Sequence, residues 1–307
     1  MTMILITAAL FMAWAIGAND SAKAVGTAVG SGVIGFKRAV LLIGIFTTLG
    51  VLLGGSGVSG TVSGLAGGIE APTLGLVLFS AAVAVTIASL WGKPISTTQS
   101  LLGALTGASL ALGLSVDWGT LGRIALAWVL SPILAALAAI VVYRLYSPVL
   151  KKVKCLRNLE LSQRWLIFTA ASFSAFNLGA NELSNVAGIL ESLGFDGPFK
   201  VVLALMLAIG ALTFSYEVMM TVGRNLSPLG PTSAFSSQLG ASLAVSAANL
   251  LGLPVSSGQA IIGAISGLSA YKGEHVNVRV LLGIVRGWIL GPLAAGGLAY
   301  LLVGLLA

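Results

Sequence analysis

Residues 13 to 32 read AWAIGANDSAKAVGTAVGSG, and residues 175 to 194 repeat the pattern as AFNLGANELSNVAGILESLG. A second pair lies further along the chain, where LWGKPISTTQSLLGALTGASLALG begins at Leu90 and LLGLPVSSGQAIIGAISGLSAYKG begins at Leu250. Both copies are separated by about 160 residues. A polar motif that recurs at corresponding positions of two apolar halves is typical of carriers with a solute site between repeats. The first interpretation is therefore a transporter.

The composition indicates an all-α integral membrane protein. Hydrophobic residues make up 57% of the chain, charged residues 8%, and the mean hydropathy is +1.03. Soluble domains carry about 25% charged residues. About ten apolar segments have close to the ~20 residues that a spanning helix requires. They cover residues 2–35, 38–58, 72–91, 95–113, 118–145, 165–194, 199–221, 231–251, 255–271 and 278–306.

These segments predict two membrane repeats, residues 1–145 and 165–307, joined by a basic linker, residues 146–164. If an odd number of segments in each repeat spans the bilayer, the second repeat is inverted. Segments 95–113 and 255–271 are short and begin with proline and hydroxyl residues, so we expect re-entrant hairpins there. The first segment is too long for one spanning helix, and we expect a break near Gly17.

Small residues also predict where helices cross. Glycine accounts for 40 of the 307 residues. Pairs spaced by four residues let helix backbones approach closely. We expect such crossings at Gly103 with Gly107, and at Gly263 with Gly267.

The linker region carries most of the excess positive charge. Its only acid is Glu160. The basic residues in and beside it are Arg144, Lys151, Lys152, Lys154, Arg157 and Arg164. The positive-inside rule places this loop in the cytoplasm of a multi-pass cell-membrane protein. A nucleic-acid partner is not expected, because the stretch is short and lacks interleaved aromatic residues.

Two residue counts argue against an enzyme. Cys155 is the single cysteine and His275, in a polar loop, is the single histidine. No internal disulfide, thiolate metal cluster or multi-histidine metal site can be built from them. We therefore expect no enzymatic activity and no cofactor.

An amide and a carboxylate lie side by side in each repeat, as Asn19-Asp20 and Asn181-Glu182. Asn185 shares a helix face with Asn181. Ionisable groups at membrane depth are costly and are usually functional or paired. Their oxygens suit sodium, and a carboxylate suits a proton. The alternative for Asp20 is a structural ion pair with Lys23, three residues on.

The second motif supplies hydrogen-bond donors at two expected helix starts. It consists of Ser96, Thr97, Thr98 and Gln99 in one repeat and Ser256, Ser257, Gly258 and Gln259 in the other. Free backbone N–H groups and hydroxyls at a helix N-terminus bind anions. Two such ends would hold a tetrahedral oxyanion. The alternative is that these hydroxyls only bond to neighbouring carbonyls or hold helices together.

The chain resembles the inorganic phosphate transporter (PiT) family. GANDSAKAVGTAVGSGVI is similar to the signature GANDxANxxGTxVGSxxI, and KPISTTQSLLGA to a first-half segment of the family. TVGRNLSPLGPTSAFSSQLGASLAV and NLLGLPVSSGQAIIGA match its C-terminal signature. The resemblance covers both halves. It implies inverted repeats, alternating access, phosphate uptake with sodium or protons, and often a homodimer.

Several residues depart from the family pattern. Lys23 stands where the family has its second Asn, whereas Asn185 keeps it in the other half. Thr47 and Gln238 replace two usual acids, and Gln99 and Gln259 replace a usual His. A lysine ammonium can substitute for a bound sodium, so our hypothesis is a changed cation stoichiometry. Lys23 facing the substrate is the other interpretation.

The combined prediction is a cation-coupled phosphate symporter. Substrate ligands are expected from both Pro-Ser segments together with Asn19 and Asn181. The expected cation ligands are Asp20, Asn19, Glu182, Asn181 and Asn185. Sulfate is the alternative substrate, since it has the same shape but carries no proton to donate. An ion channel is a less favoured class, because single acids do not suggest a pore lined with charged rings.

Overall fold

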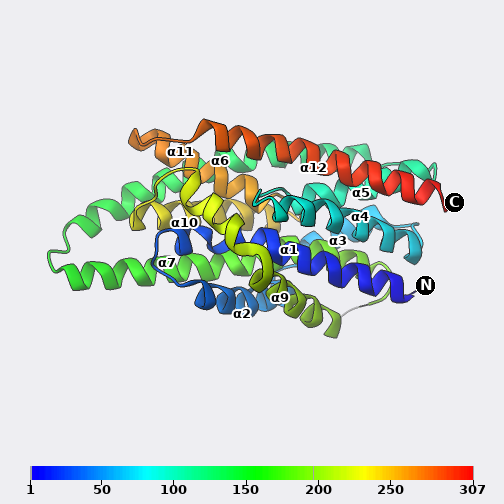
Figure 1. Cartoon of the computed structure of the whole chain (residues 1–307), viewed down its shortest axis with the longest axis horizontal. Coiled ribbons are helices and arrows are strands. Elements are labelled where there is room, and N and C mark those ends of the chain that lie inside the picture. Colours follow the sequence, from blue (N-terminus) through cyan, green and yellow to red (C-terminus); the bar gives the residue numbers. More distant parts are fainter. Residues whose placement is uncertain (1, 196, 307) are drawn as a thin grey trace.

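The computed structural model describes residues 2–195 and 197–306, which form a bundle of helices without strands in those ranges (Figure 1). The first half contains α1 (Thr2–Gly30), α2 (Phe36–Leu53), α3 (Ser56–Ala66), α4 (Ala71–Leu90), α5 (Thr97–Ala111) and α6 (Trp118–Lys151). The second half contains α7 (Leu156–Leu178), η1 (Gly179–Leu183), α8 (Ser184–Glu191), α9 (Pro198–Met220), η2 (Thr221–Asn225), α10 (Pro231–Leu250), α11 (Ser257–Lys272) and α12 (Val278–Gly304).

Six helical stretches of the described chain are long and apolar enough to cross a membrane. They are Met3–Gly30, Phe36–Leu53, Ala71–Leu90, Trp118–Lys151, Pro198–Asn225 and Val278–Gly304. The predicted all-α membrane architecture is thus confirmed. Helices α5 and α11 have 15 and 16 residues, short of a full span. The expected re-entrant hairpins within residues 95–113 and 255–271 are not observed, because each segment contains one unbroken helix. Each of these helices instead packs against the helix before it, and the pairs α4–α5 and α10–α11 are called the first and second hairpin below.

The predicted break near Gly17 was wrong. Helix α1 runs without interruption over 29 residues, about 43 Å at 1.5 Å per residue. Gly17 instead serves a helix crossing, because an added Cβ would lie 2.8 Å from the carbonyl carbon of Leu207 in α9. A break does occur in the other half. There the matching Gly179 begins the π-helical turn η1, between α7 and α8.

Helix α3 was missed by the sequence analysis. Its sequence, SGVSGTVSGLA, is rich in glycine and serine and is only 11 residues long. Gly188 of α8 rests on the backbone of Ser59, where an added Cβ would lie 2.9 Å from the Ser59 Cα. Packing against α8 therefore stabilises a helix that its composition alone does not favour.

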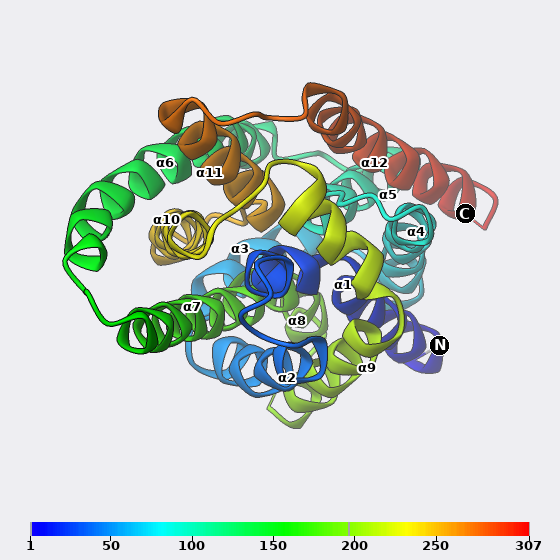
Figure 2. The ribbon, with the colours of Figure 1, turned by 60° about the vertical axis from the view of Figure 1, so that its left-hand side comes forward.

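Corresponding helices make corresponding contacts. Helix α1 packs against α9 and α4, and its counterpart α7 packs against α2 and α10. Helix α5 packs against α12, and α11 packs against α6. Helices α1 and α7 also begin at opposite ends of the molecule, as inverted repeats require (Figure 1). Figure 2 shows α1 at the centre of the bundle, surrounded by elements of both halves.

The predicted glycine crossings are confirmed in both halves. Gly103 packs on the backbone of Pro292 in α12, and Gly263 packs on that of Pro132 in α6. Gly107 lies against Gly296 in the same way, and Gly267 lies against Ala136. A side chain at any of these glycines would push the two helices apart.

The basic linker is mostly helical. Helix α6 extends through Lys151 and α7 begins at Leu156, so only the turn at residues 152–155 separates them. This connection lies at the end of the molecule opposite both chain termini (Figure 1). Cys155 is exposed there.

Candidate substrate and ion site

Two loop-to-helix junctions, one from each half, meet inside the bundle. Ser96 is the N-cap of α5 and Ser256 the N-cap of α11, and each hydroxyl accepts a hydrogen bond from the backbone N–H three residues on, at 3.2 Å. This is the favoured way to begin a helix after an extended residue. The Thr98 hydroxyl lies 3.3 Å from the Val255 carbonyl oxygen, so the two junctions are in direct contact.

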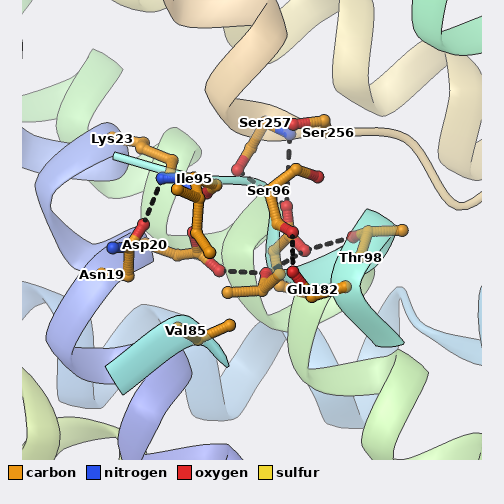
Figure 3. A network of polar contacts seen from close by, with 12 residues as sticks. Asn19, Asp20, Lys23, Val85, Ile95, Ser96, Thr98, Glu182, Ser256 and Ser257 are labelled. Atoms are coloured by element: carbon orange, nitrogen blue, oxygen red, sulfur yellow. Dashed lines mark hydrogen bonds and ion pairs between the residues drawn. The ribbon is translucent and has the colours of Figure 1, made fainter. Parts of the chain in front are cut away.

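Glu182 joins the two junctions (Figure 3). One carboxylate oxygen accepts hydrogen bonds from the Ser257 N–H at 3.2 Å and its hydroxyl at 2.8 Å. The other oxygen accepts from the hydroxyls of Thr97, at 2.9 Å, and Thr98. The side chain is buried, with 1% of its surface exposed. A buried carboxylate therefore uses the donors of both helix starts.

Asp20 lies beside this network, on α1. Its carboxylate forms a buried ion pair with the Lys23 ammonium and also lies within hydrogen-bond distance of the Thr97 hydroxyl, whose single proton it shares with Glu182. The Lys23 ammonium also donates to the Ile95 carbonyl. Figure 3 shows these groups on one side of the Glu182 cluster. The Thr97 hydroxyl thus lies between the acids of the two halves.

The Lys23 stem also reaches the second hairpin. A Cβ added to Gly258 would lie 3.0 Å from two carbons of that stem and 3.3 Å from the ammonium nitrogen. Gly258 therefore makes room for Lys23 at the start of α11. The lysine contacts both halves rather than pairing with Asp20 alone.

Asn19 and Asn181 face the hairpin of their own half. The Asn19 amide donates to the Ser89 hydroxyl at 2.9 Å and the Lys93 carbonyl at 3.0 Å, and its oxygen accepts from the Ile95 N–H at 3.1 Å. The Asn181 amide donates to the Asn249 side chain at 2.5 Å. Asn19 therefore holds the loop before α5, and the Asn181 amide group holds the end of α10.

Four buried side-chain amide oxygens have no hydrogen-bond donor among the described residues. Asn185 donates to the Thr98 hydroxyl at 3.0 Å, but its own oxygen finds no hydrogen-bond donor in the described chain. The same holds for the side-chain oxygens of Asn181, Gln99 and Gln259. Buried acceptors are usually satisfied, so the oxygens of Asn181 and Asn185, which flank Glu182 in the sequence, fit a cation. Gln99 instead borders an apolar groove with Trp128 and Pro292.

A set of polar residues on α7 and α10 was not predicted from the sequence. Gln238 was noted only as a departure from the family, yet it donates to the Ser174 hydroxyl at 2.6 Å and accepts from Thr27 at 2.5 Å. Asn249 could have been predicted, because the duplication aligns it with Ser89. Ser89 accepts a hydrogen bond from Asn19, and Asn249 accepts one from Asn181. For Ser174 and Asn177 the sequence carries no comparable signal.

Known proteins resemble this chain over nearly its whole length. Residues 16–299 match the model of the phosphate transporter family. A "Putative phosphate permease" of Methanocaldococcus jannaschii is 31% identical, over 93% of this chain and 91% of its own length. One of Pyrococcus furiosus is 25% identical, over 97% and 94%.

A solved structure shares the fold. It is described as "The sodium-dependent phosphate transporter", with a TM-score of 0.86 and 24% identity over 99% of this chain and 98% of that one. The family match spans both helix starts and both Asn-acid pairs. This membrane protein therefore belongs to the phosphate transporter family.

Proposed function

We propose that this protein carries inorganic phosphate across the cell membrane by cation-coupled symport with alternating access. The family match and the relatives named as phosphate permeases support phosphate as the substrate. The description of the structural relative supports sodium as the first cation to test, with a proton as the alternative. A cytoplasmic linker follows from its basic residues.

The observation that carries this proposal is the position of Glu182. Its carboxylate takes the Thr97, Thr98 and Ser257 hydroxyls and the Ser257 N–H, which are the groups an oxyanion would use. Helix N-termini and hydroxyl donors together favour an anion. Phosphate binding therefore requires Glu182 to give up these donors.

A bound cation can draw Glu182 away from these donors. The unpartnered oxygens of Asn181 and Asn185 lie on the same turn region as Glu182. A sodium ion between them would draw the carboxylate away from the helix starts and free the donors for phosphate. Ion and substrate would then bind only together, which is the requirement for symport.

In the first half, Lys23 takes the place of the cation. Its ammonium neutralises the buried Asp20 and remains tethered to the chain. We propose that this half binds no external cation and that coupling depends on the Glu182 side alone. Because Lys23 also touches the second hairpin, it adds positive charge close to the oxyanion site.

The experiment is uptake of radiolabelled phosphate into proteoliposomes. An imposed sodium gradient should drive saturable accumulation, and phosphate trapped inside should accelerate it by counterflow. A pH gradient without sodium separates proton coupling from sodium coupling. Excess sulfate should compete weakly if a carboxylate still accepts the proton that phosphate carries and sulfate lacks.

Three results would contradict parts of the proposal. Equal competition by sulfate would make sulfate a substrate of this site. Linear flux without counterflow would indicate a channel. Absence of phosphate uptake under both gradients would contradict the proposed function itself. The homodimer implied by the family resemblance stays a prediction, to be checked by cross-linking in membranes.

A further inference from the structure

The interface between α7 and α10 has polar contacts near the linker end of the molecule and near the site, with buried apolar residues such as Ala171 and Phe235 on the two helices between them. Side chains of α7 and η1 are joined to those of α10 by hydrogen bonds between hydroxyl and amide groups. They are Gln163 to Thr232 at 3.4 Å, Gln238 to Ser174 at 2.6 Å, Ser246 to Asn177 at 2.8 Å and Asn181 to Asn249 at 2.5 Å. Since both helices start at the linker end, this series leads from that face to Glu182.

The matching interface of the first half, between α1 and α4, is apolar. The duplication pairs Ser174 with Met12, Asn177 with Ala15, Gln238 with Leu78, and Ser242 with Ala82. All four first-half residues are buried. Only the innermost bond, from Asn19 to Ser89, has a polar counterpart. Consistent with this, α1 and α4 are among the six apolar spans of the described chain, whereas α7 and α10 are not.

Two cavities open where this polar interface reaches the linker face. They have volumes of about 280 and 440 Å³, and both are lined by Gln163 and Pro231. The first is also lined by Lys151 and Lys272, and the second by Arg157, Glu160 and Arg164. Basic residues outnumber acids at both mouths. Such a field raises the local concentration of an anion.

A third, much smaller cavity lies at the inner end. Its volume is about 10 Å³, close to what a single water requires. It is lined by Lys23, Ser174, Asn177, Gln238, Ser242 and Ser257, together with apolar residues. Polar side chains of the α7–α10 interface therefore lie around one small cavity together with Lys23 and the start of α11.

We infer that the α7–α10 interface is the passage by which the oxyanion moves between the buried site and the linker face. In this conformation the passage is closed by its own hydrogen bonds. Hydroxyl and amide partners can be exchanged for water or for an oxyanion at little net cost. Wetting the apolar α1–α4 interface would be unfavourable. This inference rests on the proposed function.

The test is the access of a thiol reagent to single cysteines. The reagent is a membrane-impermeant methanethiosulfonate carrying a sulfonate, which has the same sign of charge as phosphate. Variants Ser242→Cys and Ser174→Cys probe the passage in a Cys155→Ser background. Their matched controls are Ala82→Cys and Met12→Cys, at the corresponding positions of the first half. The exposed Cys155 of the unmodified protein identifies the linker side of the vesicles.

We expect both passage variants to react at least tenfold faster from the linker side than from the opposite side, and tenfold faster than their controls. Similar rates for Ser242→Cys and Ala82→Cys, or faster reaction from the opposite side, would overturn the passage. So would protection of both passage cysteines, because polar residues that only hold helices together stay closed. Serine to cysteine changes one atom, and gel filtration checks the fold.

The same samples separate this inference from the proposed function. Reagent access does not require phosphate to be the substrate, whereas phosphate uptake by the unmodified protein does. One-sided access without phosphate uptake would leave the passage standing and remove the proposed substrate. Phosphate uptake without one-sided access would support the proposed substrate and overturn the passage.

Discussion

The two halves of the molecule share their hairpins but differ at the acids. Both hairpins begin their second helix with a serine cap at the same position and distance. In the first half, however, α1 is continuous and Asp20 is neutralised by Lys23. In the second half the chain makes a π-helical turn at Gly179–Leu183, and Glu182 is held by neutral donors only.

Under the proposed function, the two repeats have different roles. The first half would carry its own cation, whereas the second would present a carboxylate and amide oxygens to a cation from solution. π-Helical turns occur frequently at functional sites, which fits the second half as the ion-binding one.

Lys23→Asn should make the first half resemble the second. Removing one partner of a buried ion pair costs about 3–5 kcal/mol, so the variant should be much less stable than the unmodified protein in sodium-free buffer. Sodium should then restore about 2.7 kcal/mol at 100 times its Kd, by binding beside Asp20. Thermal unfolding in detergent, with and without sodium, measures both effects. A sodium response equal to that of the unmodified protein would refute the equivalence of ammonium and sodium.

Glu182→Gln should lower phosphate uptake by about 100-fold. The amide has no negative charge with which to bind a sodium ion. Loss of one charge-assisted interaction of about 1.5–3 kcal/mol corresponds, near its upper end, to about 100-fold. The initial uptake rate measures this effect. The control is Glu70→Gln at the exposed start of α4, which should retain normal uptake. Near-normal uptake by Glu182→Gln would remove Glu182 from the coupling mechanism.

Asn19→Ala and Asn181→Ala should differ in stability. Asn19 makes three hydrogen bonds to its hairpin, and Asn181 donates one. At about 1 kcal/mol for each bond, Asn19→Ala should cost about 2 kcal/mol more than Asn181→Ala. If the Asn181 oxygen binds sodium, Asn181→Ala also loses the stability that bound sodium provides. The difference in unfolding free energy between the two variants should then be smaller in sodium than in sodium-free buffer. Equal losses in sodium-free buffer would show that the two residues anchor their hairpins alike.

Gly103→Ala and Gly263→Ala should have nearly the same effect. Both glycines pack on the backbone of an in-helix proline, Pro292 and Pro132, and an added methyl must push each helix away. Overpacking of this kind costs about 1–3 kcal/mol. Melting temperatures of the two variants should therefore agree closely. A large difference would mean that the divergence of the halves extends into their helix packing.

Local patterns in the sequence predicted most of the fold. The boundaries of α4, α9 and α10 follow their apolar segments within a residue or two, and the glycine spacing located both crossings. The error at Gly17 has a nonlocal cause. The same Gly-Ala-Asn sequence is α-helical in one half and π-helical in the other. Gly17 packs against α9 and Gly179 packs against α2, and the local sequence does not encode these contacts.

The candidate site was predicted as a set of residues but not as a set of contacts. The duplication identified the Ser-Thr segments and the acids, which the structure brings together around Glu182. It did not indicate that Asn19 and Asn181 anchor hairpins. Nor could it reveal Ser174 and Asn177, because isolated polar residues in a helix become part of one interface only after α7 pairs with α10.

The most direct test of the contrast between the halves is the number of sodium ions carried with each phosphate. Parallel uptake of radioactive sodium and phosphate into proteoliposomes gives this ratio for the unmodified protein and for Lys23→Asn. If the ammonium of Lys23 replaces one cation, Lys23→Asn protein that still transports should carry about one more sodium ion per phosphate than the unmodified protein. An unchanged ratio would contradict the account.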